Sequence, residues 1–150
     1  MQISKFFSPE SISLTLQASD RDGILKELVS LLKLDSSSGV GVYDMLKRRE
    51  NLASTGIGRG VAVPHCRSLF VPQLLAAYAH KPQGIDFMAI DEKPVYDFFL
   101  IVAPPLEISN DYLPVLGQIA GLMKGPDMPE RLAQLERPQQ FLELLDEVTV

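Results

Sequence analysis

The chain has 150 residues, of which 46% are hydrophobic and 22% charged, as in an ordinary globular protein, and we expect residues 1–150 to form one domain. Acidic residues outnumber basic ones by 19 to 14, and the net charge of −5 argues against nucleic-acid binding, which needs a basic surface. The single cysteine excludes an intrachain disulfide. The sequence shows neither a secretory signal nor an apolar run of about 20 residues, so we expect a cytoplasmic protein without membrane insertion.

The first third of the chain is predicted to contain one strand and two helices. Apolar and polar residues alternate strictly over residues 11–17, which predicts a half-buried strand. Apolar residues at helical spacing predict a helix from about Arg21 to Lys33. A short second helix, with Val42, Met45 and Leu46 facing inward, is predicted to end near Arg49 or Glu50. Residues 35–41, between these helices, are rich in serine and glycine, and we expect a turn there.

Three strands are predicted in the middle of the chain. Residues 60–64 and 73–81 have the length and composition of short strands, and residues 84–87 are predicted to form a turn or a short extended piece. Residues 94–102 are apolar on both faces, which implies a central strand covered on both sides. Because three strands follow one another with short links, part of the sheet is expected to be antiparallel.

The last third is predicted to be helical. Pro114 is tolerated only in the first turn of a helix, so the first of these helices should begin near residues 109–111, and Gly125 fits its end. Pro129 and Pro138 each stand where a further helix can start. The resulting order, β-α-α-β-β-β-α-α-α, predicts an α/β fold with helices on both faces of the sheet.

The chemistry of the chain is concentrated in residues 48–67. This stretch holds four arginines, two adjacent hydroxyl residues, three alternate glycines and one of the two histidines. Alternate glycines let the backbone approach a ligand, and successive N–H groups in such a loop can bind an anion. The stretch is neither a Walker loop nor a dinucleotide-binding fingerprint, and without the histidine a glycine-rich turn would be the simpler interpretation.

His65 is the candidate nucleophile of this stretch. Pro64 fixes its own φ and pushes Val63 toward extended geometry, so the imidazole should leave the strand end in a defined direction. A neutral imidazole nitrogen can attack a phosphoryl group, a transfer that needs positioning and positive charge more than acid–base groups. Taken singly, the histidine would be a packing or surface residue and each arginine a solvated charge; the whole set within twenty residues favours a site. The candidates for charge and hydrogen bonding are Arg49, Arg59, Arg67, Ser54 and Thr55.

The pattern Arg49-Glu50-x-Leu52-x-Ser54-Thr55-Gly56-Ile57-Gly58-x-Gly60-Val61-Ala62-x-Pro64-His65-x-Arg67 resembles a known signature. It is similar to the active-site signature of the mannitol/fructose-type EIIA domains of the bacterial phosphoenolpyruvate-dependent phosphotransferase system, which nitrogen-regulatory EIIA proteins share. The segments Gly84-Ile85-Asp86-Phe87 and Asp91-x-Lys93-Pro94-Val95 resemble a second segment of that family. The resemblance covers nearly the whole chain and implies a three-layer α/β/α sandwich with a small mixed sheet.

The resemblance also implies roles for individual residues. His65 would accept a phosphoryl group, usually through Nε2 in this family, from a small phosphocarrier protein of the HPr or NPr type. Arg49 matches the arginine beside the phosphohistidine. No metal or cofactor is expected, because the protein itself compensates the charge. The residues that match the phosphate-binding wall are Ser54, Thr55, Gly56, Gly58, Arg59, Gly60 and Arg67.

One position departs from the family pattern. Many members carry a second active-site histidine in a pattern like Asn-x-His-Leu, whereas this chain has Asn110-Asp111-Tyr112-Leu113. Tyr112 is predicted to lie beside His65, where its phenol can donate a hydrogen bond but, with a pKa near ~10, carries no positive charge at neutral pH. Slower transfer, tuning for regulation and loss of phosphorylation are the open consequences. Cys66 is expected to pack inward, and His80, at a strand end, to be structural or exposed.

The leading hypothesis is a phosphocarrier, phosphorylated reversibly at His65 and of the nitrogen-regulatory kind, whose phosphorylation state controls target proteins. A sugar-specific EIIA component that passes its phosphoryl group to a separate EIIB is one alternative. The other is an interaction module of the same fold that has abandoned the chemistry, an alternative that Tyr112 keeps open. A domain like the cytoplasmic part of anion exchangers is disfavoured, because such relatives need not keep the histidine signature.

Overall fold

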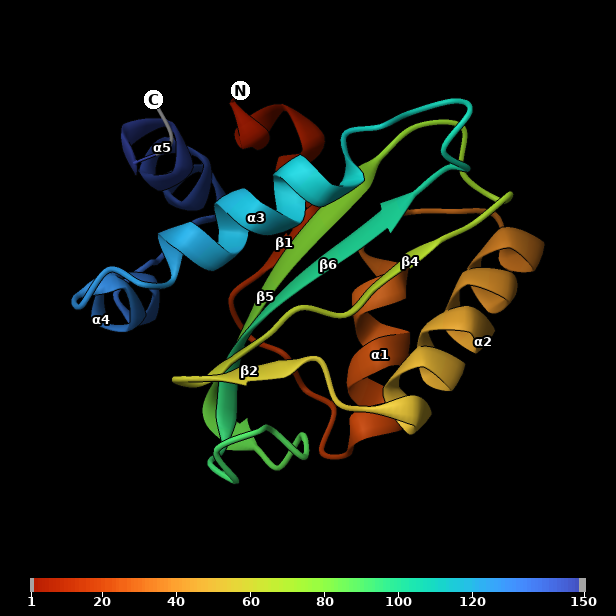
Figure 1. Cartoon of the computed structure of the whole chain (residues 1–150). Coiled ribbons are helices and arrows are strands. Elements are labelled where there is room, and N and C mark those ends of the chain that lie inside the picture. Colours follow the sequence, from red (N-terminus) through yellow and green to blue (C-terminus); the bar gives the residue numbers. More distant parts are fainter. Residues whose placement is uncertain (1, 149–150) are drawn as a thin grey trace.

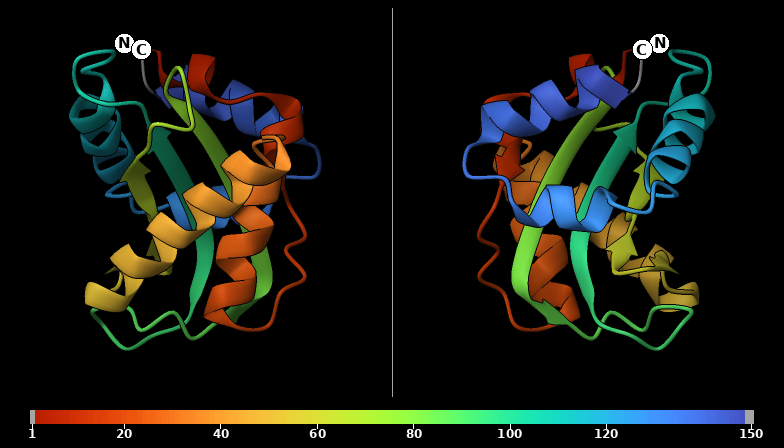
Figure 2. Two further views of the ribbon diagram at one scale, coloured as in Figure 1. Left: turned by 90° about the vertical axis from the view of Figure 1, so that its right-hand side faces the viewer. Right: turned by 90° about the vertical axis from the view of Figure 1, so that its left-hand side faces the viewer.

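A computed structural model describes residues 2–148 as helices packed on both faces of one mixed sheet (Figures 1 and 2). The strands are β1 (Ile12–Ser13), β2 (Gly56–Gly58), β3 (Val61–Ala62), β4 (His65–Arg67), β5 (Leu75–Ile85) and β6 (Val95–Ala103). The helices are α1 (Arg21–Ser30), α2 (Ser36–Leu52), α3 (Tyr112–Leu122), α4 (Met128–Ala133) and α5 (Pro138–Val148), preceded by the short 3-10 turns η1 (Ile3–Phe6) and η2 (Pro9–Ser11). The predicted α/β/α sandwich is confirmed. No helix among residues 2–148 is long and apolar enough to cross a bilayer.

The antiparallel pair β5 and β6 forms the centre of the sheet. The order is β1-β5-β6-β3-β2, with β4 also paired to β6, so β3 and β4 follow one another along the same edge of β6. β1 pairs in parallel with β5, and β3 and β4 pair in parallel with β6. Every residue of β6 except Tyr96 is buried, as predicted for a central strand.

Each face of the sheet has its own hydrophobic core. Residues Phe99 and Ile101 of β6 pack toward α3, α4 and α5, whereas Phe98, Leu100 and Val102 pack toward α1 and α2. This alternation follows from the period of two along a strand. A side chain of this size contributes about 1.5–3 kcal/mol when it is fully buried, so the two cores fix β6 and every strand that pairs with it.

The first strand is shorter than predicted. Only Ile12 and Ser13 pair as β1, although the backbone N–H of Leu16 still donates to the backbone carbonyl oxygen of His80 at 3.0 Å. Beyond that point the carboxylate of Glu27 accepts from the N–H groups of Gln17 and Ala18 at 3.1 and 2.9 Å. A side chain from α1 therefore takes the backbone donors that a longer strand would have used.

The prediction of a turn over residues 35–41 is wrong. α2 begins at Ser36, and the carboxylate of Asp35 caps it by accepting from the N–H of Ser38 at 3.3 Å. The two glycines cost roughly 1 kcal/mol each in a helix, but a side chain at Gly41 would overlap the ring of Phe70. The helix accepts glycine there because the β4–β5 connection packs directly against it.

The remaining boundaries follow the predictions with local changes. α1 ends at Ser30 rather than Lys33, which has a left-handed φ of 56°. β5 continues through Gly84 to Ile85, beyond the predicted end at 81, with a register shift opposite β6. The three predicted C-terminal helices are confirmed, and Pro114 lies in the first turn of α3.

Candidate active site

His65 is the first residue of β4, and this strand runs near α2 (Figure 1). The predicted strand over 60–64 is in fact interrupted: β3 ends at Ala62, and pairing resumes at His65 opposite Ile101. Pro64 has no N–H to donate, but its carbonyl oxygen accepts from Ile101 at 3.0 Å, so the chain stays on β6 across the break. His65 thus opens a strand rather than leaving the end of one.

The backbone orients the imidazole of His65. Its Nδ1 lies 2.6 Å from the carbonyl oxygen of Val63, two residues earlier. Because a carbonyl can only accept, Nδ1 carries the proton of this bond, and the neutral ring then has its free lone pair on Nε2. The side chain is half-buried, so Nε2 is the nitrogen available for chemistry.

Tyr112, the first residue of α3, lies beside His65 as predicted. The two ring centroids are 5.8 Å apart, and the ring planes are inclined by 57°. Burial raises the pKa of Tyr112 well above its ordinary value, and the positive charges of Arg67 and Arg49 oppose this effect only in part. The phenol therefore stays protonated at neutral pH and remains a hydrogen-bond donor.

Arg67 lies over the ring of Tyr112. Its guanidinium carbon is 4.6 Å from the ring centroid of Tyr112. One guanidinium nitrogen donates to the carbonyl oxygens of Pro104 and Ser109, at 2.8 and 3.3 Å. These bonds tie β4 to the connection between β6 and α3, so the cation is fixed where the two elements meet.

Arg49 comes from the last turn of α2. Its Nη1 donates to the carbonyl oxygen of Ala53 at 2.6 Å, and its charge is close enough to Tyr112 to favour the phenolate. Arg49 and Arg67 therefore bring positive charge to the His65–Tyr112 pair from two different elements.

The hydroxyls of Ser54 and Thr55 are bonded within the protein. The Ser54 hydroxyl donates to the carbonyl of Phe87 at 2.6 Å and accepts from the N–H of Gly56 at 3.0 Å. The Thr55 hydroxyl donates to the carboxylate of Glu50, which also accepts from the Thr55 N–H at 3.0 Å. Both hydroxyls thus fix the segment that runs beside β3. The backbone carbonyl oxygen of Thr55 accepts from the N–H of Val63 at 3.0 Å, and Val63 is the residue whose own carbonyl orients His65.

The rest of the glycine-rich stretch does not reach His65. Residues 56–62 form a hairpin of β2 and β3, whose tip holds Gly58, Arg59 and Gly60, all with positive φ. Gly60 accepts from the N–H of Asp97, four residues before Ile101, the partner of His65. At roughly 3.3 Å per residue this is about 13 Å along β6. The Arg59 guanidinium donates to Gly125 at 3.2 Å, so the structure places this predicted phosphate ligand away from the imidazole.

Cys66 points to the opposite face of β4, as predicted. It belongs to the core beneath α1 and α2, and burial raises the pKa of its thiol to about 12. His65 and Cys66 are therefore separated by the sheet itself and form no nucleophilic pair.

Two buried carboxylates were given no role in the sequence interpretation. Glu50 continues the buried face of α2 from Val42 and Leu46 at intervals of four residues, and this spacing could have revealed it. Asp97 binds Tyr78 and His80, so His80 is structural as expected, although it lies within β5 rather than at its end. Among residues 2–148 no group of three or more His, Cys, Asp or Glu side chains is arranged to hold a metal ion.

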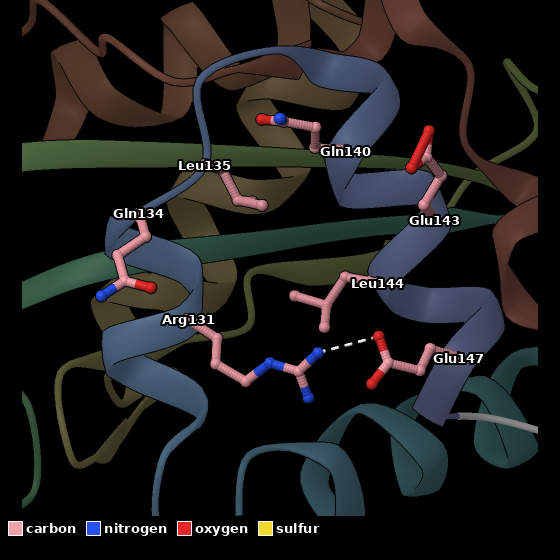
Figure 3. Close-up of a pocket in the computed structure, with 7 residues that line it drawn as sticks. All are labelled: Arg131, Gln134, Leu135, Gln140, Glu143, Leu144 and Glu147. Carbon is pink, nitrogen blue, oxygen red and sulfur yellow. Dashed lines mark hydrogen bonds and ion pairs between the residues drawn. The ribbon is translucent and has the colours of Figure 1, made fainter.

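A separate pocket lies between α4 and α5, which pack on β5 and β1 (Figure 3). Arg131 on α4 and Glu147 on α5 pair across it at 2.8 Å, and the apolar side chains of Leu135 and Leu144 lie between the two helices. Arg131 and Glu147 thus neutralise each other, whereas Arg49 and Arg67 near His65 make no ion pair with any described residue.

Known proteins resemble this chain over most of its length. Residues 5–148 match the family described as "Phosphoenolpyruvate-dependent sugar phosphotransferase system, EIIA 2". The chain belongs to this family. The fructose-specific EIIA component of Haloferax volcanii is 31% identical over 150 residues, covering 97% of this chain and 96% of that protein.

Solved structures show the same EIIA fold. Nitrogen regulatory protein IIA-Ntr from Neisseria meningitidis is 29% identical, with a TM-score of 0.87, covering 97% of this chain and 99% of that one. The mannitol enzyme IIA of Escherichia coli, solved in complex with phosphorylated mannitol enzyme IIB, has a TM-score of 0.74 at 20% identity, covering 94% of this chain and 99% of that one. This last likeness concerns the fold alone. Relatives of this EIIA chain thus include both sugar-specific and regulatory proteins.

Proposed function

We propose that this EIIA protein is a phosphocarrier that accepts a phosphoryl group on Nε2 of His65 from an HPr- or NPr-type protein. The observation that carries the proposal is the bond from Nδ1 of His65 to the carbonyl of Val63, because it leaves Nε2 as the free nucleophile. Membership of a phosphotransferase family supplies the type of reaction.

The transfer requires one bond to form as another breaks. Nε2 of His65 donates its lone pair to phosphorus while the phosphorus–nitrogen bond of the donor phosphohistidine breaks, and the donor imidazole leaves with that electron pair. The charge on the transferred group stays on its equatorial oxygens, where Arg67 and Arg49 can stabilise it and the Tyr112 hydroxyl can donate a hydrogen bond. No proton needs to be removed from Nε2 in this step.

The surface next to His65 suits a protein partner. Four exposed apolar residues lie near Arg67 and Tyr112 in the sequence. They stand on the connections that follow β4 and β6 and on the first turn of α3. They are Leu69, Leu106, Ile108 and Leu113, each more than 60% exposed. Protein interfaces typically bury an apolar centre beside arginine anchors.

We assign the protein to the regulatory, nitrogen type, in which the phosphorylation state controls target proteins in the cytoplasm. The likeness to IIA-Ntr over nearly the whole of both chains supports this assignment. The fructose-specific relative supports a second candidate, a sugar-specific component that passes its phosphoryl group to a separate EIIB.

Phosphorylation can be tested directly. The protein would be incubated with radiolabelled phosphoenolpyruvate, enzyme I and an HPr- or NPr-type carrier, and the label tested for acid lability and base stability. We expect labelling of the wild type and of His80→Ala, and none of His65→Ala. An unlabelled wild type would contradict the proposal and favour an interaction module without chemistry, and label retained in His65→Ala would assign it to another residue.

A further inference from the structure

A cavity of about 320 Å³ lies between the tip of the β2–β3 hairpin, the start of β6 and α4. It is separate from His65, because it borders Asp97, about 13 Å along β6 from the partner of His65. Its charged and polar lining residues are Arg59, His80, Asp97 and Glu130. Its walls include the apolar surfaces of Pro82, Tyr96 and Pro129.

The inner side of this cavity carries a buried charge. Asp97 is only 2% exposed, and its Oδ1 accepts from the Tyr78 hydroxyl at 2.6 Å and lies 2.9 Å from Nδ1 of His80. No hydrogen bond within residues 2–148 engages the second carboxylate oxygen of Asp97 or Nε2 of His80. Because Asp97 lines the cavity, its second oxygen and Nε2 of His80 are the polar atoms left free on this side for a ligand.

The outer side carries a guanidinium and a second carboxylate. Arg59 has a left-handed φ of 59°, and its backbone N–H donates to Asp91 at 3.2 Å, which fixes the turn that carries it. One guanidinium nitrogen donates to Gly125 at 3.2 Å, and no other bond of this group is present within residues 2–148. Glu130 on α4 lies opposite and makes no ion pair with any described residue.

The wall between these charges is rigid and apolar. The ring of Tyr96 lies over Gly84, where a β-carbon would come within 2.6 Å of Cε1, and approaches Gly60, where one would lie 3.4 Å from Cδ2. Both glycines have positive φ, so the backbone can bend around the ring. Tyr96 is therefore held as a fixed face of the cavity.

We propose that this cavity binds a free α-amino acid with an apolar side chain. The guanidinium of Arg59 would take the carboxylate, the oxygens of Asp97 and Glu130 would take the ammonium, and Tyr96 with the two prolines would cover the side chain. A simple anion would face two carboxylates, and a simple cation would leave the guanidinium unpaired, whereas a zwitterion matches both signs of charge. This binding site is independent of the phosphocarrier reaction proposed for His65.

Nuclear magnetic resonance of the ¹⁵N-labelled full chain tests this proposal. L-leucine and the larger L-phenylalanine would be titrated as probes, alongside 4-methylpentanoate, which lacks the ammonium, and 3-methylbutylamine, which lacks the carboxylate. We expect saturable shifts at the residues lining the cavity, with both truncated analogues binding at least tenfold more weakly than L-leucine. Arg59→Gln should remove the advantage of L-leucine over 3-methylbutylamine, while the exposed Arg137→Gln and the active-site variant His65→Ala should leave binding unchanged.

Any of the following results would overturn the proposal: no saturable shift with either amino acid, 4-methylpentanoate binding as tightly as L-leucine, or unchanged L-leucine binding in Arg59→Gln. Glu130→Gln is a second probe at an exposed position that should fold normally. It should weaken L-leucine and leave 4-methylpentanoate unaffected or bound more tightly, and the reverse pattern would also contradict the assignment of the ammonium.

Discussion

The guanidinium carbon of Arg67 lies over the ring of Tyr112, 4.6 Å from its centroid. Arg67 belongs to β4 and Tyr112 to α3. Arg67 also donates to two carbonyl oxygens of the connection that leads into α3. Tyr112, the residue expected to replace a second histidine of the signature, thus makes a cation–ring contact beside His65. Substitutions at Arg67 and Tyr112 therefore test what each residue contributes to stability and to phosphorylation.

Replacement of Arg67 should impair both folding and phosphorylation. Arg67→Gln removes the cation–ring contact, worth about 0.5–1 kcal/mol at a partly exposed site, and the guanidinium bonds to Pro104 and Ser109. We expect a loss of about 1–2 kcal/mol in the free energy of unfolding, measured in urea, and at least a tenfold lower phosphorylation rate. Arg137→Gln is the matched control, and equal effects in both variants would contradict a specific role for Arg67.

The hydroxyl of Tyr112 should accelerate phosphorylation modestly. Tyr112→Phe keeps the ring against His65 and Arg67 but removes the hydroxyl that we propose donates to the transferred phosphoryl group. One such hydrogen bond is worth about 0.5–1.5 kcal/mol, so the transfer rate should fall about three- to tenfold. Because burial raises the pKa of Tyr112, the wild-type rate should show no loss from phenol ionisation as the pH rises toward 10.

Tyr112→His tests the departure from the signature in the other direction. A faster transfer than in the wild type would mean that the missing imidazole limits the reaction. An unchanged or slower transfer, measured by rapid quench with the same carrier, would mean that the tyrosine on Arg67 serves at least as well. A rate in Tyr112→Phe equal to that of the wild type would remove the hydroxyl from the mechanism.

How much of this site could be predicted from sequence depends on the kind of constraint. The proximity of His65 and Tyr112 was predicted because the resemblance supplied a long-range pairing that local patterns do not contain. The inward orientation of Cys66, opposite to that of His65, was predicted from strand geometry alone. The interruption at Pro64 was missed. The predicted strand ended at Pro64, whereas the chain continues along β6 past this residue, which lacks only the N–H donor.

Other errors arose where tertiary contacts override local preference. Residues 35–41 have the composition of a turn, yet the Asp35 cap and the ring of Phe70 make them helical. Arg59 is close to His65 in the sequence but is carried away from it by the hairpin, since pairing of β2 with β3 directs the turn toward Asp97 rather than Ile101. Sequence proximity therefore overstated the number of residues around the imidazole.

The hydrogen bond between the Thr55 hydroxyl and the Glu50 carboxylate should contribute to the free energy of unfolding. Thr55→Val leaves the buried carboxylate of Glu50 without a hydroxyl donor, which costs about 1–3 kcal/mol. We expect that loss in the free energy of unfolding, whereas Thr55→Ser, which keeps the hydroxyl, should lose less. Equal destabilisation by serine and valine would show that packing of the methyl group, and not the hydrogen bond, is responsible.

The thiol of Cys66 should link stability to alkaline pH. Burial raises its pKa from 9.0 to about 12, so the folded state favours the neutral thiol. This stabilisation is fully present below pH 9 and is lost between pH 9 and 12, with a slope of up to about 1.4 kcal/mol per pH unit. Cys66→Ala should flatten that part of the stability curve relative to the wild type, and identical pH dependence in both proteins would contradict the assignment.

β4 pairs with β6 and with no other strand of the described chain, so the second edge of the strand that bears the imidazole has no strand partner. Such an edge can recruit the strand of another molecule and seed aggregation. Here it is only three residues long, begins immediately after a proline that offers no donor, and ends on an arginine. These features leave little for a foreign strand to pair with, so an approaching protein must engage this surface through its side chains.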